Sequence, residues 1–193
     1  MHMIRLVALL LAALASLPPS YAAAPERDIP KATWEPIYFR SINQLSGKAG
    51  WRPLRDLALP ADSFEVRVWI GFGIGPLEAL SMRREDSTWS GRYAIQGPRN
   101  ADPVAVEAVT PKSGWDQLWA RLVRLDLLTL PDSSTLPKSQ IAVTDGVSYV
   151  VEINKDGRYR TYMYANPKYE KWSEAKRIIE IIETLRDEIL PKF

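Results

Sequence analysis

The chain has 193 residues, no cysteine and one histidine, and its 25 basic and 23 acidic side chains leave a formal net charge of +2. The lack of cysteine excludes disulfide frameworks, thiol nucleophiles and iron–sulfur clusters, and the near-neutral charge argues against a dedicated nucleic-acid-binding protein. A chain of this length forms one domain, or two small ones, with a core that needs no disulfide or zinc for stability.

The first residues have the three-part pattern of a secretory signal peptide. Arg5 supplies a positive charge, residues 6–14 form an uninterrupted apolar run, and small residues around Ala22 mark a cleavage site. The apolar run is too short to cross a bilayer, which needs about 20 residues. We therefore expect removal of residues 1–22, no stable membrane anchor, and release of the product into the periplasm or outside the cell.

Cleavage would also remove the only histidine, His2. A mature chain without histidine and cysteine cannot form Ser-His-Asp triads, Cys-His pairs, or metal sites that use these ligands. We therefore expect no catalytic residue of these classes, no metal and no cofactor. Residues 23–32 are predicted to be a flexible tether, and residues 33–193 a single domain.

The domain begins with a short predicted helix, whose apolar residues recur at helical spacing. They are Trp34, Ile37, Tyr38, Ile42 and Leu45. Residues 64–71 then alternate as in a half-buried strand, with Glu65, Arg67 and Trp69 on one face and apolar residues on the other. Further strands are predicted over residues 77–84, 89–95 and 103–109, which gives an antiparallel meander.

Alternate glycines at positions 71, 73 and 75 follow the first of these strands. A second strand comes next instead of a helix, so the pattern does not match a phosphate-binding loop. We interpret the run as a turn that needs positive φ or a close backbone contact. The alternative is a flexible flap with Phe72 and Ile74 exposed at its tip.

Two longer helices and three more strands complete the domain. One helix begins near Ser113 and the other covers residues 169–190, and each has a single apolar stripe. The strands between them are predicted over residues 140–145, 148–153 and 158–165. The sequence therefore predicts an α+β fold, with an antiparallel sheet of about six or seven strands and the two main helices packed on one face.

The hairpin over residues 148–165 carries the candidate binding surface. A three-residue turn at residues 155–157 would put alternate arginines and tyrosines on the face away from the core, and these residue types dominate the energetic centres of interfaces. The surface consists of Arg158, Arg160, Tyr162 and Tyr164, with Glu152 paired to Arg160. A register slip of one residue would exchange the faces, and a solvated face or a face covered by a helix are the alternatives.

Two other groups of residues offer weaker candidates. Trp51 and Trp69 are possible ligand-facing aromatics, since stacked tryptophan binds sugar rings. A glycoside hydrolase needs two acids about 5–10 Å apart across a cleft, and nothing in the spacing selects one pair of acids. The candidate acids on predicted strands are Glu65, Glu78, Asp145 and Glu152.

These observations favour a non-catalytic binding protein that recognises another envelope or secreted macromolecule. Inhibitors, immunity-type proteins and envelope accessory factors fit this description, and the oligomeric state stays open. Two alternatives remain: an envelope glycan hydrolase that uses two carboxylates, and a small-ligand carrier with an apolar cavity between the sheet and the two main helices.

Overall fold

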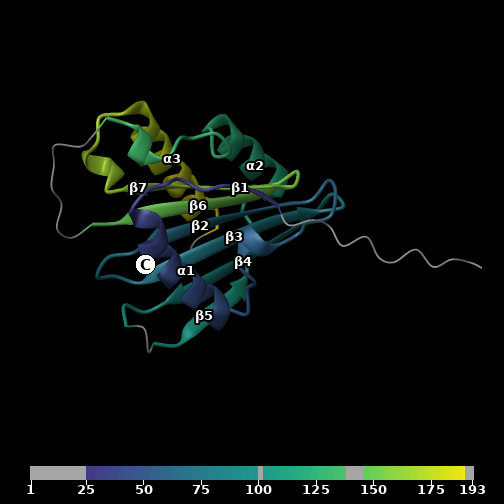
Figure 1. Ribbon diagram of the computed structural model, residues 1–193. Coiled ribbons are helices and arrows are strands. Elements are labelled where there is room, and N and C mark those ends of the chain that lie inside the picture. The colour runs from purple at the N-terminus through teal and green to yellow at the C-terminus, as the bar shows by residue number, and fades with distance from the viewer. Residues whose placement is uncertain (1–24, 100–101, 138–145, 190–193) are drawn as a thin grey trace, which may run out of the picture.

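The computed structural model describes residues 25–99, 102–137 and 146–189, which form one seven-stranded sheet with helices on both faces (Figure 1). The strand order is β1-β7-β6-β2-β3-β4-β5, and every neighbouring pair is antiparallel except β1 with β7. The strands are β1 (Glu26–Asp28), β2 (Phe64–Gly71), β3 (Leu77–Glu85), β4 (Thr88–Gln96), β5 (Val104–Ala108), β6 (Ser148–Lys155) and β7 (Arg158–Ala165). The α+β class is confirmed.

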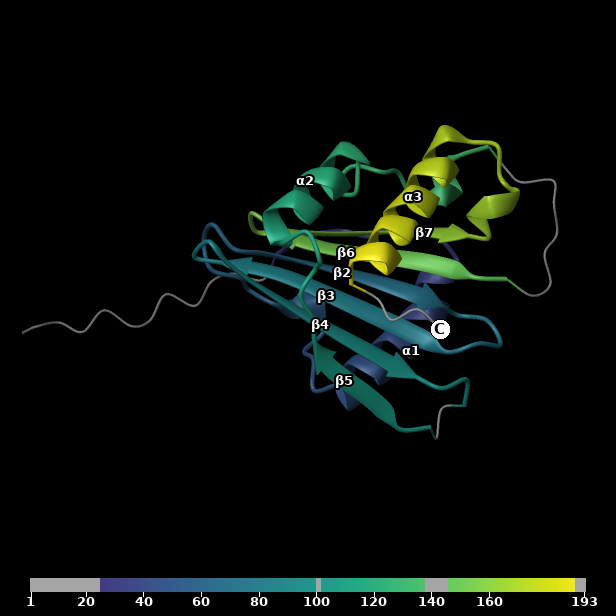
Figure 2. The same cartoon turned by 180° about the vertical axis from the view of Figure 1, so that it is seen from behind.

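In the described residues, three α-helices and three short 3₁₀ turns accompany the sheet. The helices are α1 (Trp34–Lys48), α2 (Trp115–Arg124) and α3 (Ser173–Glu188), and the turns are η1 (Leu54–Asp56), η2 (Ser133–Thr135) and η3 (Pro167–Tyr169). Helices α2 and α3 cover one face and α1 covers the other, as the two opposite views show (Figures 1 and 2). Within the part of the chain that the structure describes, no helix is long and apolar enough to cross a membrane.

The face beneath α2 and α3 is an apolar core. The apolar half of the β2 alternation points into it, as predicted, and so do the stripes of both helices. Its fully buried members include Val66, Val68, Leu118, Leu122, Ile178, Ile181 and Leu185. Helix α3 starts at Ser173, later than predicted, because η3 and the extended backbone at Trp172 come first.

The two main helices, α2 and α3, pack on one face as predicted, but the opposite face is also covered by α1, which the prediction did not include. Helix α1 packs Trp34, Phe39, Ile42 and Leu45 against this face. Small and apolar side chains from five neighbouring strands provide the surface that the helix needs: Trp69, Ala79, Ala94, Val150 and Met163. The α1 stripe therefore has its own layer of core, separate from that of α2 and α3.

One edge of the sheet differs from the sequence prediction and the other agrees with it. Glu26–Asp28, within the expected tether, pairs with β7 as β1. The strand predicted over residues 103–109 is confirmed as β5, the opposite edge. The strand predicted over residues 140–145 lies outside the described residues.

Candidate functional site

The hairpin register differs by one residue from the prediction. Asp156 and Gly157 both have positive φ, 54° and 71°, so they form a two-residue turn and Lys155 pairs with Arg158. Two-residue turns of this kind match the twist of the flanking strands, and Asp-Gly favours them. The expected three-residue turn is therefore wrong, and Glu152 pairs with Thr161 instead of Arg160.

This register places the expected binding surface under α2 and α3. Tyr162 and Tyr164 are 0% and 1% exposed, and their hydroxyls donate to the carbonyls of Leu127 and Pro131 at 2.7 and 2.8 Å. Arg160 also donates to carbonyls of this loop, those of Leu128 and Leu130. The predicted exposed face is therefore wrong: these side chains hold the loop after α2 against the sheet.

Arg158 is the only member of that set with a largely exposed side chain. Its side chain is 76% exposed and forms an ion pair of 3.2 Å with Glu26 of β1. Glu152, the fifth member, points to the opposite face of the sheet and is 2% exposed. The structure therefore does not bring the five residues together.

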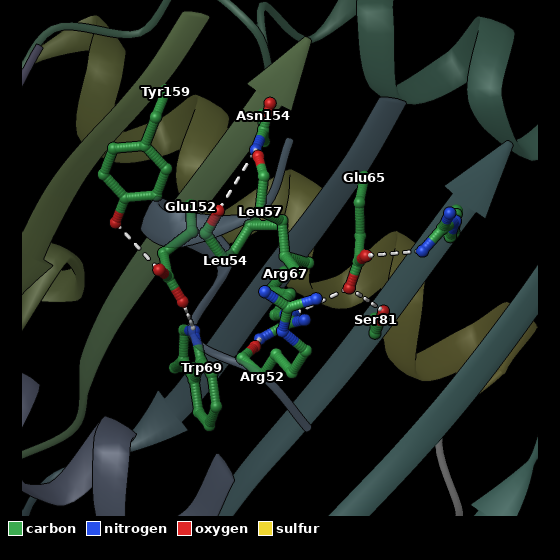
Figure 3. Close-up of polar contacts among 11 residues, drawn as sticks. Arg52, Leu54, Leu57, Glu65, Arg67, Trp69, Ser81, Glu152, Asn154 and Tyr159 are labelled. Atoms are coloured by element: carbon green, nitrogen blue, oxygen red, sulfur yellow. Dashed lines mark hydrogen bonds and ion pairs between the residues drawn. The ribbon is translucent and has the colours of Figure 1, made fainter. Parts of the chain in front are cut away.

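Glu152 belongs to a buried polar cluster beneath α1 and η1 (Figure 3). Its two carboxylate oxygens accept hydrogen bonds from the indole of Trp69 at 2.7 Å and from the hydroxyl of Tyr159 at 2.8 Å. Burial raises the pKa of Glu152 above its ordinary value, although Arg67 acts in the opposite direction. The carboxyl group is thus fully committed to partners inside the protein.

A second carboxylate, Glu65, lies in the same cluster. It accepts from the guanidinium of Arg67 at 2.7 Å and from the hydroxyl of Ser81 at 2.8 Å. Arg67 is 1% exposed and also donates to the carbonyl of Arg52. Asn154 donates to the carbonyls of two further residues in the η1 segment (Figure 3). Side chains of the sheet therefore fix the segment between α1 and β2 through its backbone oxygens.

The two candidate tryptophans are part of this interior. Trp51 and Trp69 are 4% and 0% exposed, and their ring centroids lie 6.1 Å apart. The guanidinium groups of Arg67 and Arg92 lie 5.3 and 5.1 Å from the centroid of Trp51. The expectation of ligand-facing aromatics is therefore wrong for the conformation seen here, because the polar face of β2 is covered by the chain itself.

Of the four candidate acids of a glycan hydrolase, the three that the structure describes do not face each other across an open cleft. Glu65, Glu78 and Glu152 are each less than 10% exposed, and each accepts a hydrogen bond from at least two side chains. Asp145 lies outside the described residues. Among the residues that are described, no group of three acids or histidines is placed to hold a metal ion.

An open groove lies at the end of the sheet where the β2–β3 loop meets α3. Its volume is about 610 Å³. Residues of the loop form one wall and α3 the other, with Val147 and Pro167 between them. Ile74, in the loop wall, is 81% exposed, the highest value among the large exposed apolar side chains of the described residues. The groove therefore combines an exposed apolar side chain with a lining of both apolar and charged residues.

Close backbone contacts shape this end of the sheet. A Cβ atom on Gly71, which has a φ of 134°, would lie 2.4 Å from the carbonyl oxygen of Pro76, and one on Gly73 would lie 2.5 Å from that of Gly146. Gly146 in turn leaves room for the side chain of Asn166. The interpretation of the glycine run as a positive-φ turn with a close contact is confirmed.

The alternative of a flap with Phe72 and Ile74 exposed at its tip is right for Ile74 and wrong for Phe72. Phe72 stacks on Tyr38 of α1, with ring centroids 4.5 Å apart and an interplanar angle of 13°. Ile74 has no such partner and points to solvent. One side of the loop is thus anchored to α1, while the other presents Ile74 beside the groove.

One part of the groove is polar. Arg186 of α3 donates to Glu78 of β3 at 2.8 Å, and the hydroxyl of Tyr93 donates to the same carboxylate at 2.8 Å. Burial raises the pKa of Tyr93 and that of Tyr149, so both phenols stay neutral. The carboxylate of Glu78 in this part of the groove is therefore occupied by two side-chain donors.

Comparisons with protein-family models, with curated proteins and with solved structures give no match to this chain. The function must therefore be argued from the chain's own geometry. Sequence reasoning found the glycine run but not the groove, because the groove also needs Gly146, Asn166 and α3, which are distant in sequence. The only local signals of these partners are the Asp-Gly and Asn-Pro dipeptides at 145–146 and 166–167.

Proposed function

We propose that this protein is a non-catalytic binding protein of the periplasm or extracellular space, and that it recognises another protein through the groove beside Ile74. The exposure of Ile74 carries the proposal. Ile74 is 81% exposed and lies on a loop with tightly packed glycines. Exposure of a large apolar side chain to water costs free energy, and contact with a partner would remove this cost.

The chemistry of the groove suits an apolar anchor from the partner. Its walls present Ile74, Val147 and Ile179, and the ion pair of Glu78 with Arg186 lies in its polar part. Interfaces commonly combine a buried apolar centre with polar groups at the rim. A partner segment would place an apolar side chain against Ile74 and its backbone near the polar part.

The buried carboxylates argue against the hydrolase alternative. A general acid or nucleophile must reach the substrate, whereas Glu65 and Glu152 are 1% and 2% exposed and are occupied by internal donors. Glu78 is the only candidate acid among the described residues that lines the groove, and it is paired with Arg186. Among the candidate acids that the structure describes, a two-carboxylate mechanism therefore has no partner for Glu78 at this site.

The proposal is tested by capture with matched variants. The chain from Ala23 is immobilised, envelope extract is passed over it, and retained proteins are identified by mass spectrometry and then titrated in purified form. We expect Ile74→Ser to weaken binding of the retained partner at least about tenfold, which corresponds to about 1.4 kcal/mol. Val123→Ser, which changes an exposed valine of α2 outside the groove, should bind like the parent. Equal binding by both variants would reject the groove.

A small-ligand carrier is the second candidate, and the groove volume favours it. About 610 Å³ lies within the range of about 300–1,000 Å³ that is typical of small-molecule sites. Native mass spectrometry of protein purified from its own compartment separates the two functions. A bound compound of defined mass that Ile74→Ser loses would support the carrier, whereas protein without such a compound and with a captured partner supports recognition of a protein.

The proposed compartment has its own test. Amino-terminal sequencing of the chain expressed with residues 1–22 should find Ala23 as the first residue of exported protein. Export without cleavage, or retention of the product in the cytoplasm, would contradict the proposed compartment.

A further inference from the structure

The two edges of the sheet differ in how they are protected against pairing with another strand. The β1 edge is three residues long and all three are charged: Glu26, Arg27 and Asp28. Short length and charge are common protections of exposed edges. The β5 edge is Val-Ala-Val-Glu-Ala, with one charge in five residues, and four of the five residues are exposed. The β5 edge therefore lacks the protection that the β1 edge has.

The backbone groups available on β5 follow from its pairing with β4. The amide of Val109 donates to the carbonyl of Gly91 at 3.0 Å, and hydrogen-bonding groups on one side of an antiparallel strand recur at every second residue. The backbone groups of Ala105 and Glu107 therefore point to β4. Those of Val104, Val106 and Ala108 point away from the sheet, and no strand among the described residues pairs with them.

We infer that β5 pairs with β5 of a second copy of this chain, antiparallel and around a two-fold axis at Val106. In this register Val106 faces its own copy and Val104 faces Ala108 of the second chain. By symmetry, Ala108 also faces Val104 of the second chain. Each of these three pairs exchanges two backbone hydrogen bonds. The two sheets then continue across the interface. This inference goes beyond the proposed recognition of a partner and does not depend on the groove.

Charge and symmetry both favour a second copy in this orientation. The antiparallel register places each Glu107 opposite Ala105 of the other chain, so the carboxylates do not meet. A parallel, in-register pairing would place the two Glu107 side chains opposite each other, which is destabilising. The pairing is isologous, since the same residues contribute from both chains, and two-fold dimers are the commonest homo-oligomers. The apolar side chains Val104 and Val106 also gain a neighbouring strand.

Sedimentation equilibrium of the chain from Ala23 tests this arrangement. The weight-average mass of the parent should rise towards twice the monomer mass with concentration. Val106→Lys and Val106→Glu should each remain monomeric at concentrations where the parent is dimeric, because like charges would face each other across the axis. An equimolar mixture of the two variants should form a one-to-one dimer, because Lys and Glu then face each other.

Val106→Thr is the matched control, since it keeps a β-branched side chain and the outward-pointing amide, and it should dimerise like the parent. Circular dichroism must show parent-like folding for every variant. A monomeric parent at all concentrations would overturn the inference. Dimers of the single Lys and Glu variants, or a mixture that fails to form the mixed dimer, would also overturn it, because the two-fold axis would then lie elsewhere.

Discussion

The two faces of the sheet are buried to a similar degree but by different chemistry. Under α2 and α3, apolar side chains pack against each other, and Tyr162 and Tyr164 of β7 donate their hydroxyls to backbone carbonyls. Under α1 and η1, two carboxylates, a guanidinium and an amide are buried, and they bind each other and backbone carbonyls. The first face is therefore held mainly by apolar packing, whereas the second combines apolar packing with buried polar bonds that fix the segment between α1 and β2.

The largest effect is expected on the polar face, from Arg67→Met. Methionine fills much of the space but leaves Glu65 and Glu152 without their buried cation. Loss of one partner of a buried pair costs about 3–5 kcal/mol, because a buried charge is left uncompensated. Urea denaturation followed by circular dichroism should therefore show a free energy of unfolding lower by about 4 kcal/mol.

The double variant Glu65→Gln/Arg67→Met is the control for this explanation. If the uncompensated charge is the cause, the double variant loses much less stability than the sum of its single variants. Additive losses would mean that Arg67 acts through packing against Trp51 and not through charge.

The apolar face is tested by Leu122→Ala in α2. Leu122 is 0% exposed, so its truncation removes apolar contacts and leaves a cavity, at a cost of about 3 kcal/mol. The loss should be the same at low and high salt, because no charge is involved. Leu122→Met, which conserves volume, should cost less than about 1.5 kcal/mol; an equal loss for both substitutions would contradict a cavity effect.

A third test uses the pH dependence of the polar face. Burial raises the pKa of Glu152 in the folded chain, so the folded state binds this proton more tightly than the unfolded state does. The contribution of Glu152 to stability is therefore largest at low pH and falls as pH rises from the ordinary carboxyl value through the raised pKa. Glu152→Gln removes this titration, and its side-chain amide still bonds with Trp69 and Tyr159.

We accordingly expect the stability of Glu152→Gln relative to the parent to rise with pH over that window, by no more than about 1.4 kcal/mol per pH unit. Unfolding free energies of both chains at a series of pH values measure this difference. A constant difference would show that Glu152 does not change its protonation between the folded and unfolded states in that range.

The contrast between the faces also explains what the sequence predicts well and what it does not. The alternation in β2 correctly separates Val66 and Val68 from Glu65 and Arg67. A polar strand face is normally a solvated face, however, and only the tertiary structure shows that η1 covers this one. The partners of Arg67 and Asn154 include backbone oxygens of residues 52–57, which cannot be read from the pattern of side chains.

The binding surface on the hairpin was predicted wrongly for a related reason. The choice between a two- and a three-residue turn at Asp156-Gly157 decides which β7 residues share a face with Glu152, and both turns accept Asp-Gly. Amphipathic residues such as Tyr162 are equally suited to an interface and to a core with a carbonyl in reach. The groove was not predicted, because its walls come from β3, η3 and α3 as well as from the glycine run.

The smallest expected effect separates the two neighbouring arginines of β7. Arg158→Ala removes an ion pair with Glu26 in which both side chains are more than 70% exposed, and such pairs contribute about 0–1 kcal/mol. Arg160→Ala removes donors to two carbonyls of the loop after α2 and should cost about 2 kcal/mol. Denaturation of the two variants at low and high salt measures both effects. Equal losses would mean that the β1 edge, despite its exposure, contributes to stability as strongly as the loop beneath α2.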